Sequence, residues 1–147
     1  MRLVKVLLIT AFVLLMLGLA GCSSGPKPEN EAQGRVTFDD VKNEPPMTED
    51  EIVRFIEILP SFAPLEGGAD PKAEMEFYRK NSITKNRFFY LRSKTAFASL
   101  ISAGRPPDLS SVPQALHPND NEISLIDKHY EALKEAADTF NDSVRSR

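Results

Sequence analysis

ISLIDKHYEALKEAADTFNDSV, residues 123–144, is the stretch that decides the fold class, because its apolar residues recur with the period of an α-helix. Residues spaced alternately three and four apart lie on one face of a helix. Here they are Ile123, Ile126, Tyr130, Leu133, Ala137, Phe140 and Val144. The stretch therefore predicts one continuous helix with an apolar seam about 30 Å long. Only about three heptads are present, which favours a helix packed in a bundle over an extended coiled coil.

Two more helices are predicted upstream from their capping residues. Thr48-x-x-Glu51 is a capping box, and the apolar face that follows it ends where Pro60 and Pro64 interrupt the pattern. Asp70-Pro71 combines a good N-cap with proline at the first helical position, and it predicts a short helix to about residue 81.

A further helix is predicted from about Thr84 to Ala103, and its composition is that of a central element. Phenylalanine, leucine and isoleucine occur on several of its sides, with small residues between them that permit close helix approach. Gly104 and the Pro106-Pro107 pair end it. Because no strand pattern or internal repeat is present, we expect an all-α fold, a small bundle of about four helices.

The beginning of the chain has the layout of an export signal. Residues 1–21 contain Arg2 and Lys5 but no acidic residue, and an apolar run follows from Val6 to Leu17. Twelve residues of helix cover about 18 Å, which is too short for a hydrocarbon core of about 30 Å. The run ends at Leu19-Ala20-Gly21-Cys22, and Cys22 is the only cysteine of the chain.

This ending resembles the lipobox of bacterial lipoproteins, which has an aliphatic residue, two small residues and a cysteine. The resemblance covers residues 1–22 and implies that the signal peptide, residues 1–21, is removed. It also implies that the Cys22 thiol carries diacylglycerol and that its amine receives an acyl chain such as palmitate. Ser23 stands where an aspartate would retain the protein in the inner membrane, which favours the outer membrane, facing the periplasm. The alternative is an ordinary signal peptide with a cysteine near its end.

The composition after the signal divides the rest of the chain in two. Residues 22–47 are rich in Ser, Gly, Pro, Glu and Asn and predict a flexible linker, although Val36, Phe38 and Val41 could dock on the domain. Residues 48–147 are then the helical domain. Without residues 1–21 the chain has 16 basic and 21 acidic residues, a net charge of −5. This charge argues against a nucleic-acid partner, and a single cysteine excludes an intrachain disulfide.

Charge is distributed unevenly along the domain. Residues 77–107 contain seven basic residues and no acidic one, whereas the predicted last helix is mainly acidic. One interpretation is that these two helices lie side by side and their rims pair. The other leaves part of the basic strip for an anionic partner, a lipid headgroup or a cell-wall polymer. For that role we select Arg79, Lys80, Lys85 and Arg87.

The loop Gly104–Pro118 contains four prolines and lies next to this strip. Loops of this length within compact domains are often functional. The loop either covers an open end of the bundle or contacts the same partner.

Motifs of catalysis are absent from the sequence: there is no second cysteine, G-x-S-x-G, H-E-x-x-H or Gly-rich phosphate loop. His117 and His129 could in principle join Asp120, Glu122 or Asp127 at a metal ion, but their spacing does not favour it. We therefore expect no enzyme activity, no metal and no cofactor other than the lipid on Cys22.

Two functions remain. The first is a membrane-anchored binding or assembly protein, similar in general plan to the helical lipoproteins that brace envelope complexes, such as the pilotins of secretion systems. The second is a carrier or sensor with a small apolar ligand inside the bundle, lined by Phe55, Phe77, Phe88, Phe97 and Phe140. An internal cavity of about 300 Å³ or more lined by these residues would favour the carrier, and a closed core with an exposed groove would favour the binding protein.

Overall fold

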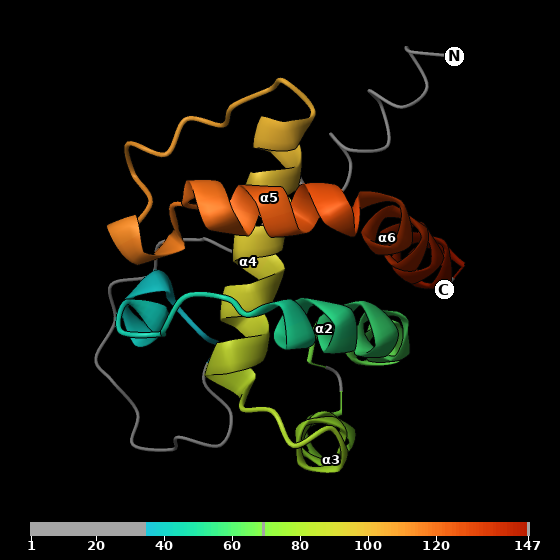
Figure 1. Ribbon diagram of the computed structural model, residues 1–147. Coiled ribbons are helices and arrows are strands. Elements are labelled where there is room, and N and C mark those ends of the chain that lie inside the picture. Colours follow the sequence, from blue (N-terminus) through green and yellow to red (C-terminus); the bar gives the residue numbers. More distant parts are fainter. Residues whose placement is uncertain (1–34, 69, 147) are drawn as a thin grey trace.

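The computed structural model describes residues 35–68 and 70–146, and it is all-α, as predicted (Figure 1). Cys22 and the predicted signal peptide lie outside these residues. The described part contains five α-helices, three short 3-10 helices and no strand. In chain order they are η1 (Phe38–Val41), α2 (Glu49–Phe62), η2 (Ala63–Leu65), α3 (Pro71–Lys80), α4 (Lys85–Ser102), η3 (Gln114–Leu116), α5 (Asp120–Lys128) and α6 (Tyr130–Arg145).

Helix α4 is the central element of the domain, as its composition predicted. It runs through the middle of the molecule, with α2 and α5 crossing it and α3 near its beginning (Figure 1). Every residue from Tyr90 to Ala98 is buried, which requires neighbours on all sides. Helix α5 packs against α4, while α6 packs against α2. The charged residues Arg92 and Lys94 of α4 are therefore buried by the elements that surround this helix.

The predicted starts of α2 and α3 and the predicted end of α4 are confirmed. The Thr48 hydroxyl accepts a hydrogen bond from the Glu51 amide, and the Glu51 carboxylate accepts one from the Thr48 amide at 3.0 Å. Asp70 Oδ1 accepts from the first two free amides of α3, both at 3.0 Å. At the end of α4, Gly104 has φ +70°, and Arg105 N–H donates to the Leu100 carbonyl, as in a Schellman motif.

Helix α2 corrects one of these expectations, because it continues through Pro60 to Phe62. Pro60 lies in the last turn of the helix, where its missing N–H costs one hydrogen bond and few residues follow to be displaced. The interruption predicted at Pro60 and Pro64 becomes a change to the 3-10 turn η2.

The prediction of one continuous last helix is wrong, because the chain breaks at His129 into α5 and α6. His129 has φ −106° and ψ 12°, outside the helical range. Its Nε2 lies 3.0 Å from the Glu49 carboxylate, at the beginning of α2. The physical reason for the break is packing, since α5 lies against α4 and α6 lies against α2, and a straight helix could not follow both.

Residues 35–47, here called the arm, are packed on the domain. Val41 is fully buried and Met47 nearly so, while Val36 and Phe38 are half-buried against the core. The Phe38 and Phe89 rings are 6.0 Å apart. Of the two alternatives for these residues, a flexible linker and a docked segment, the structure shows the docked one.

The proline-rich loop Gly104–Pro118 also contributes to the core. Leu116, in η3, is fully buried, and Leu109 and Val112 are half-buried against the core. His117 Nε2 lies 2.8 Å from the Val112 carbonyl, which holds the loop across its own turn. These contacts favour the covering role over the partner-binding one.

Candidate functional site

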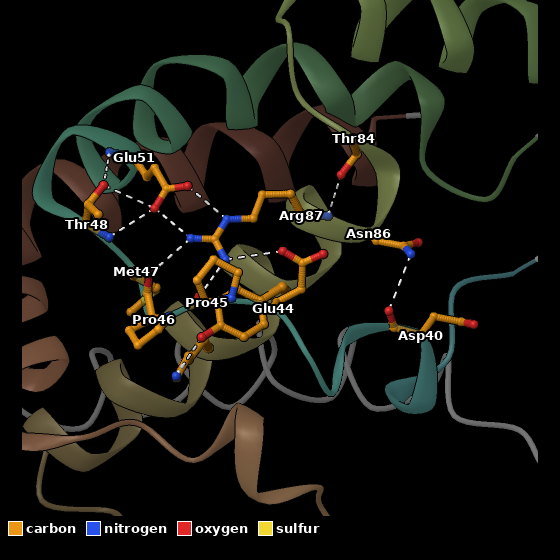
Figure 2. A network of polar contacts seen from close by, with 12 residues as sticks. Asp40, Glu44, Pro45, Pro46, Met47, Thr48, Glu51, Thr84, Asn86 and Arg87 are labelled. Atoms are coloured by element: carbon orange, nitrogen blue, oxygen red, sulfur yellow. Dashed lines mark hydrogen bonds and ion pairs between the residues drawn. The ribbon is translucent and has the colours of Figure 1, made fainter.

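Arg87, one of the four residues selected for partner binding, holds the arm to α4. Its guanidinium donates to both carboxylate oxygens of Glu51, at 2.8 and 2.6 Å. It also donates to the Pro45 and Pro46 carbonyls at 2.6 and 3.2 Å, and to Glu44 at 3.3 Å (Figure 2). Only 12% of its side chain is exposed. Main-chain acceptors and carboxylates together use the donors of this group.

The electrostatics of Arg87 and Glu51 agree with this geometry. Partial burial acts to raise the pKa of the Glu51 carboxyl, but hydrogen bonds from Arg87 and the Thr48 amide outweigh it and hold the pKa below its usual value. Burial likewise acts to lower the pKa of Arg87, and the Glu51 hydrogen bond outweighs it and raises that pKa. Both groups are therefore charged at neutral pH, and their pairing joins α4 to α2 and positions the Arg87 guanidinium that bonds the arm.

The other three selected residues lie at the beginning of α4 and the end of α3. Lys85 Nζ is 3.0 Å from Glu74, and Arg79 pairs with Glu76 one helical turn earlier. Lys80 is exposed. Arg79, Lys85 and Arg87 thus pair with carboxylates of α3, the arm and α2 rather than with those of the acidic last helix. Partner binding by the four residues stays a prediction.

The expected pairing between the basic helix and the acidic last helix is present at Lys94, but other basic side chains of α4 have partners elsewhere. Lys94 Nζ of α4 is 2.8 Å from Glu122 of α5. Other basic side chains pair instead with acids of the arm, α2, α3 and the loop after η2. The expected pairing assumed one straight last helix beside α4. Because the chain breaks at His129, α6 packs against α2.

Glu122, considered in the sequence only as a metal ligand, has a structural role that the sequence did not indicate. Its side chain is 2% exposed, and Oε1 accepts hydrogen bonds from Lys94 Nζ and from the Met47 amide, the latter at 2.9 Å. Oε2 accepts from the Asn119 amide at 2.9 Å. Lys94 also donates to the Tyr90 hydroxyl at 2.7 Å. One carboxylate thus joins the arm, α4 and α5, and the only local signal for it was the Asn119-x-x-Glu122 capping box.

A cleft of about 540 Å³ lies between the arm, the end of α2, α3 and the first half of α4, and it is open to solvent on one side. Phe62 and Phe88 form its base, with ring centroids 4.6 Å apart. Above them lie the half-buried apolar side chains of Val36, Leu65, Tyr78 and Phe89. The cleft is therefore an aromatic depression to which four separate segments contribute.

Two ion pairs stand at the rim of this cleft. Arg92 donates to both carboxylate oxygens of Glu66, at 2.7 and 3.0 Å. Glu74 accepts from Lys85 and, at 3.0 Å, from the Tyr78 hydroxyl. Burial and the neighbouring Glu74 raise the pKa of Tyr78, so its phenol stays protonated and donates. Each rim carboxylate thus has a cation beside it.

The five phenylalanines named for the carrier lie in the same core, but of the five only Phe88 lines the cleft. Phe88 contacts Phe55 and Phe77, with ring centroids 5.5 and 5.4 Å from theirs. The residues considered for a metal site are not brought together. His117 and His129 bond separate partners, and Glu122 is occupied by Lys94. In residues 35–68 and 70–146, no group of three His, Cys, Asp or Glu side chains is placed to hold a metal ion.

Comparison with known proteins assigns the chain to no family. No family model matches it, and no curated protein or solved structure matches it either. Among the described residues, none of the helices has the length and apolar character needed to cross a membrane.

Proposed function

We propose that this chain is a lipid-anchored protein of the bacterial cell envelope whose helical domain binds another envelope component. The anchor is Cys22, and the domain faces the periplasm from the outer membrane. The observation that carries this proposal is the lipobox Leu19-Ala20-Gly21-Cys22 after a short apolar run. Two acyl chains on Cys22, each methylene contributing about 0.8 kcal/mol on insertion, would be enough for stable anchoring.

The docked arm supports this proposal by limiting the distance between domain and membrane. Residues 23–34 separate Cys22 from Arg35, the first described residue. Twelve residues span at most about 40 Å even when fully extended. With the arm docked rather than free, the domain stays close to the bilayer and meets components at or near its surface.

The core geometry favours a binding role over the carrier alternative. A carrier of an apolar molecule must enclose most of its ligand surface. Phe55 and Phe140 are fully buried in the core, and Phe77 and Phe97 are nearly so, but none of them lines the cleft. The cleft that is present opens at the surface, as a site for a partner would. No catalytic group is required for this role.

Anchoring is tested by fractionation of cells that express the wild-type chain or Cys22→Ala. We expect the wild-type protein to incorporate labelled palmitate and to stay with membranes after a high-salt wash. Cys22→Ala should take up no label and leave the membrane fraction. Ser23→Ala is the matched control and should behave as wild type. A wild-type chain without label, together with a variant that still pellets, would contradict the proposal.

A further inference from the structure

We infer that the cleft between the arm, η2, α3 and α4 receives large apolar side chains, aromatic or leucine-like, from a polypeptide segment of an envelope protein. This inference rests on the proposed function, because it names the kind of partner that the anchored domain binds. It concerns a surface that the sequence did not indicate, although Lys85 at its rim and Phe88 at its base were selected for other roles.

The apolar part of the cleft provides the first argument. Val36, Leu65, Tyr78 and Phe89 are only half-buried, and they come from four segments that meet here. Beneath them, Phe62 and Phe88 contact the ring of Phe77 of α3 in tilted and edge-on arrangements, with ring centroids 5.2 and 5.4 Å from it. A firm aromatic base below partly exposed apolar groups is the arrangement found where anchor side chains of a partner insert.

The charges at the rim identify the class of partner. The rim has both signs, and its Arg92–Glu66 and Lys85–Glu74 pairs are already formed. An anionic headgroup or polymer would have to displace a carboxylate from each pair. A polypeptide needs no such displacement, since it can hydrogen-bond to a polar rim while its apolar side chains fill the centre.

The openness of the cleft argues against a lipid or a small apolar ligand as occupant. An acyl chain that leaves the bilayer loses about 0.8 kcal/mol for each methylene that is not covered again. A cleft of about 540 Å³ that is open on one side leaves part of such a chain in water. A side chain attached to a folded partner does not meet this difficulty, because the partner itself covers the open side.

The position of the arm supports an envelope partner rather than a distant one. Arg35 and Val36 form part of the cleft wall, and they lie where the described chain begins. The twelve residues between Cys22 and Arg35 place this wall within about 40 Å of the anchored cysteine. The occupant is therefore a protein segment close to the membrane surface.

The test uses a photoreactive phenylalanine analogue placed in the full-length, membrane-bound chain in living cells. One chain has it at Leu65 in the cleft, and the control has it at Met75, a 52% exposed apolar residue of α3 outside the cleft. We expect irradiation to give a protein adduct from position 65 and not from position 75. Mass spectrometry should place the crosslink in a partner peptide beside aromatic or leucine side chains.

A second substitution shows whether the adduct depends on the cleft. Val36→Asp in the chain with the probe at position 65 should lower the adduct yield about tenfold, because it puts a charge into the apolar wall. If its melting midpoint also falls, Val36→Thr replaces it, with a smaller decrease expected and an unchanged melt. An adduct insensitive to a folded Val36 variant would overturn the inference.

Other outcomes also overturn it: a lipid adduct, an adduct only with a second copy of this chain, or equal yields from positions 65 and 75. Failure of the proposed anchoring is distinguishable, because it is measured by palmitate incorporation in the same cells. An adduct at position 65 from a chain without lipid would keep the partner site and remove the anchor. A lipidated chain that gives no adduct would keep the anchor and remove the partner site.

Discussion

The arm and helix α3 both lie at the edge of the domain beside α4, yet they are attached to it in opposite ways. The arm has little regular structure, but it buries Val41 and Met47 completely or nearly so, and buried Glu122 accepts its main-chain N–H. Helix α3 is regular and well capped, yet of its ten residues Phe77 is the buried one. Regular secondary structure is therefore a poor guide to how strongly a segment is integrated, which depends on buried area and long-range polar contacts.

The largest effect is expected from removal of the arm. A fragment of residues 48–146 loses two buried side chains, each contributing about 1.5–3 kcal/mol, together with the bonds to Arg87 and Glu122. We expect urea denaturation to show a loss of about 5 kcal/mol relative to residues 35–146, the matched control. Equal stability of the two fragments would mean that the arm is as peripheral as its composition suggested.

The next largest effect is expected from the buried Lys94–Glu122 pair, which bonds the main chain of the arm at Met47. Lys94→Met leaves the Glu122 carboxylate buried without its cation, which should cost about 3–5 kcal/mol in the free energy of unfolding. Adding Glu122→Gln removes the unpaired charge and keeps an acceptor for the Met47 amide. Chemical denaturation should therefore show that the double variant recovers most of the loss. A double variant as unstable as Lys94→Met would indicate a packing defect rather than an uncompensated charge.

A smaller effect is expected from Arg87, whose side chain is partly accessible to solvent. Arg87→Leu keeps the apolar contacts but removes the hydrogen bonds to Glu51 and to two main-chain carbonyls, at a cost of about 2 kcal/mol. Hydrogen exchange should accelerate in residues 44–51 more than in α3. Uniform acceleration over the domain would show that Arg87 supports global stability and not the arm in particular.

Low pH should weaken the contacts of Arg87 with residues 44–51, because one of its partners is the Glu51 carboxylate. The pKa of Glu51 is below its usual value of 4.5 in the folded chain, so its contribution is complete above pH 4.5 and is lost as the pH falls through the folded-state pKa. We expect amide protection in residues 44–51 to decrease below pH 4.5. Glu51→Gln, which cannot lose a charge, should have weaker protection at neutral pH and a flatter profile. An identical profile for both chains would assign the acid response to other carboxylates.

The smallest effect is expected on α3. The side chains of Arg79 and Glu76 are 75% and 59% exposed, and solvent screens their pairing. Arg79→Gln should therefore leave the melting midpoint unchanged within error, as should Glu76→Gln. A clear decrease for either would show that the surface of α3 is more tightly integrated than its burial indicates.

Local signals in the sequence were enough to place the helices. Side chains that bond amides two or three residues away, such as Thr48 and Asp70, mark a helix start, and Gly104 marks an end through its positive φ. The occurrence of apolar residues on several sides of α4 likewise indicated a central helix. These features depend on neighbouring residues alone, and the structure confirms them.

The Lys85–Glu74 pair and the cleft show where local signals were insufficient. Lys85 was selected as an available charge because no acid is near it in its own segment after Glu76. The cleft combines side chains from the arm, η2, α3 and α4, none of which forms an apolar surface by itself. Neither the neutralised rim nor the aromatic base could be inferred before these segments were placed side by side.

The sequence by itself determined the all-α class, the central place of α4 and the helix caps, and its resemblance to a lipobox motivates the proposed anchor. Only the tertiary structure decided that the arm docks, that the last helix breaks at His129 and that Arg87 and Glu122 hold the parts together. The physical reason is the separation of the interacting groups along the chain. Arg87 and Glu51 are 36 residues apart and Met47 and Glu122 are 75 apart, so their pairing is set by helix packing rather than by any pattern within one helical turn.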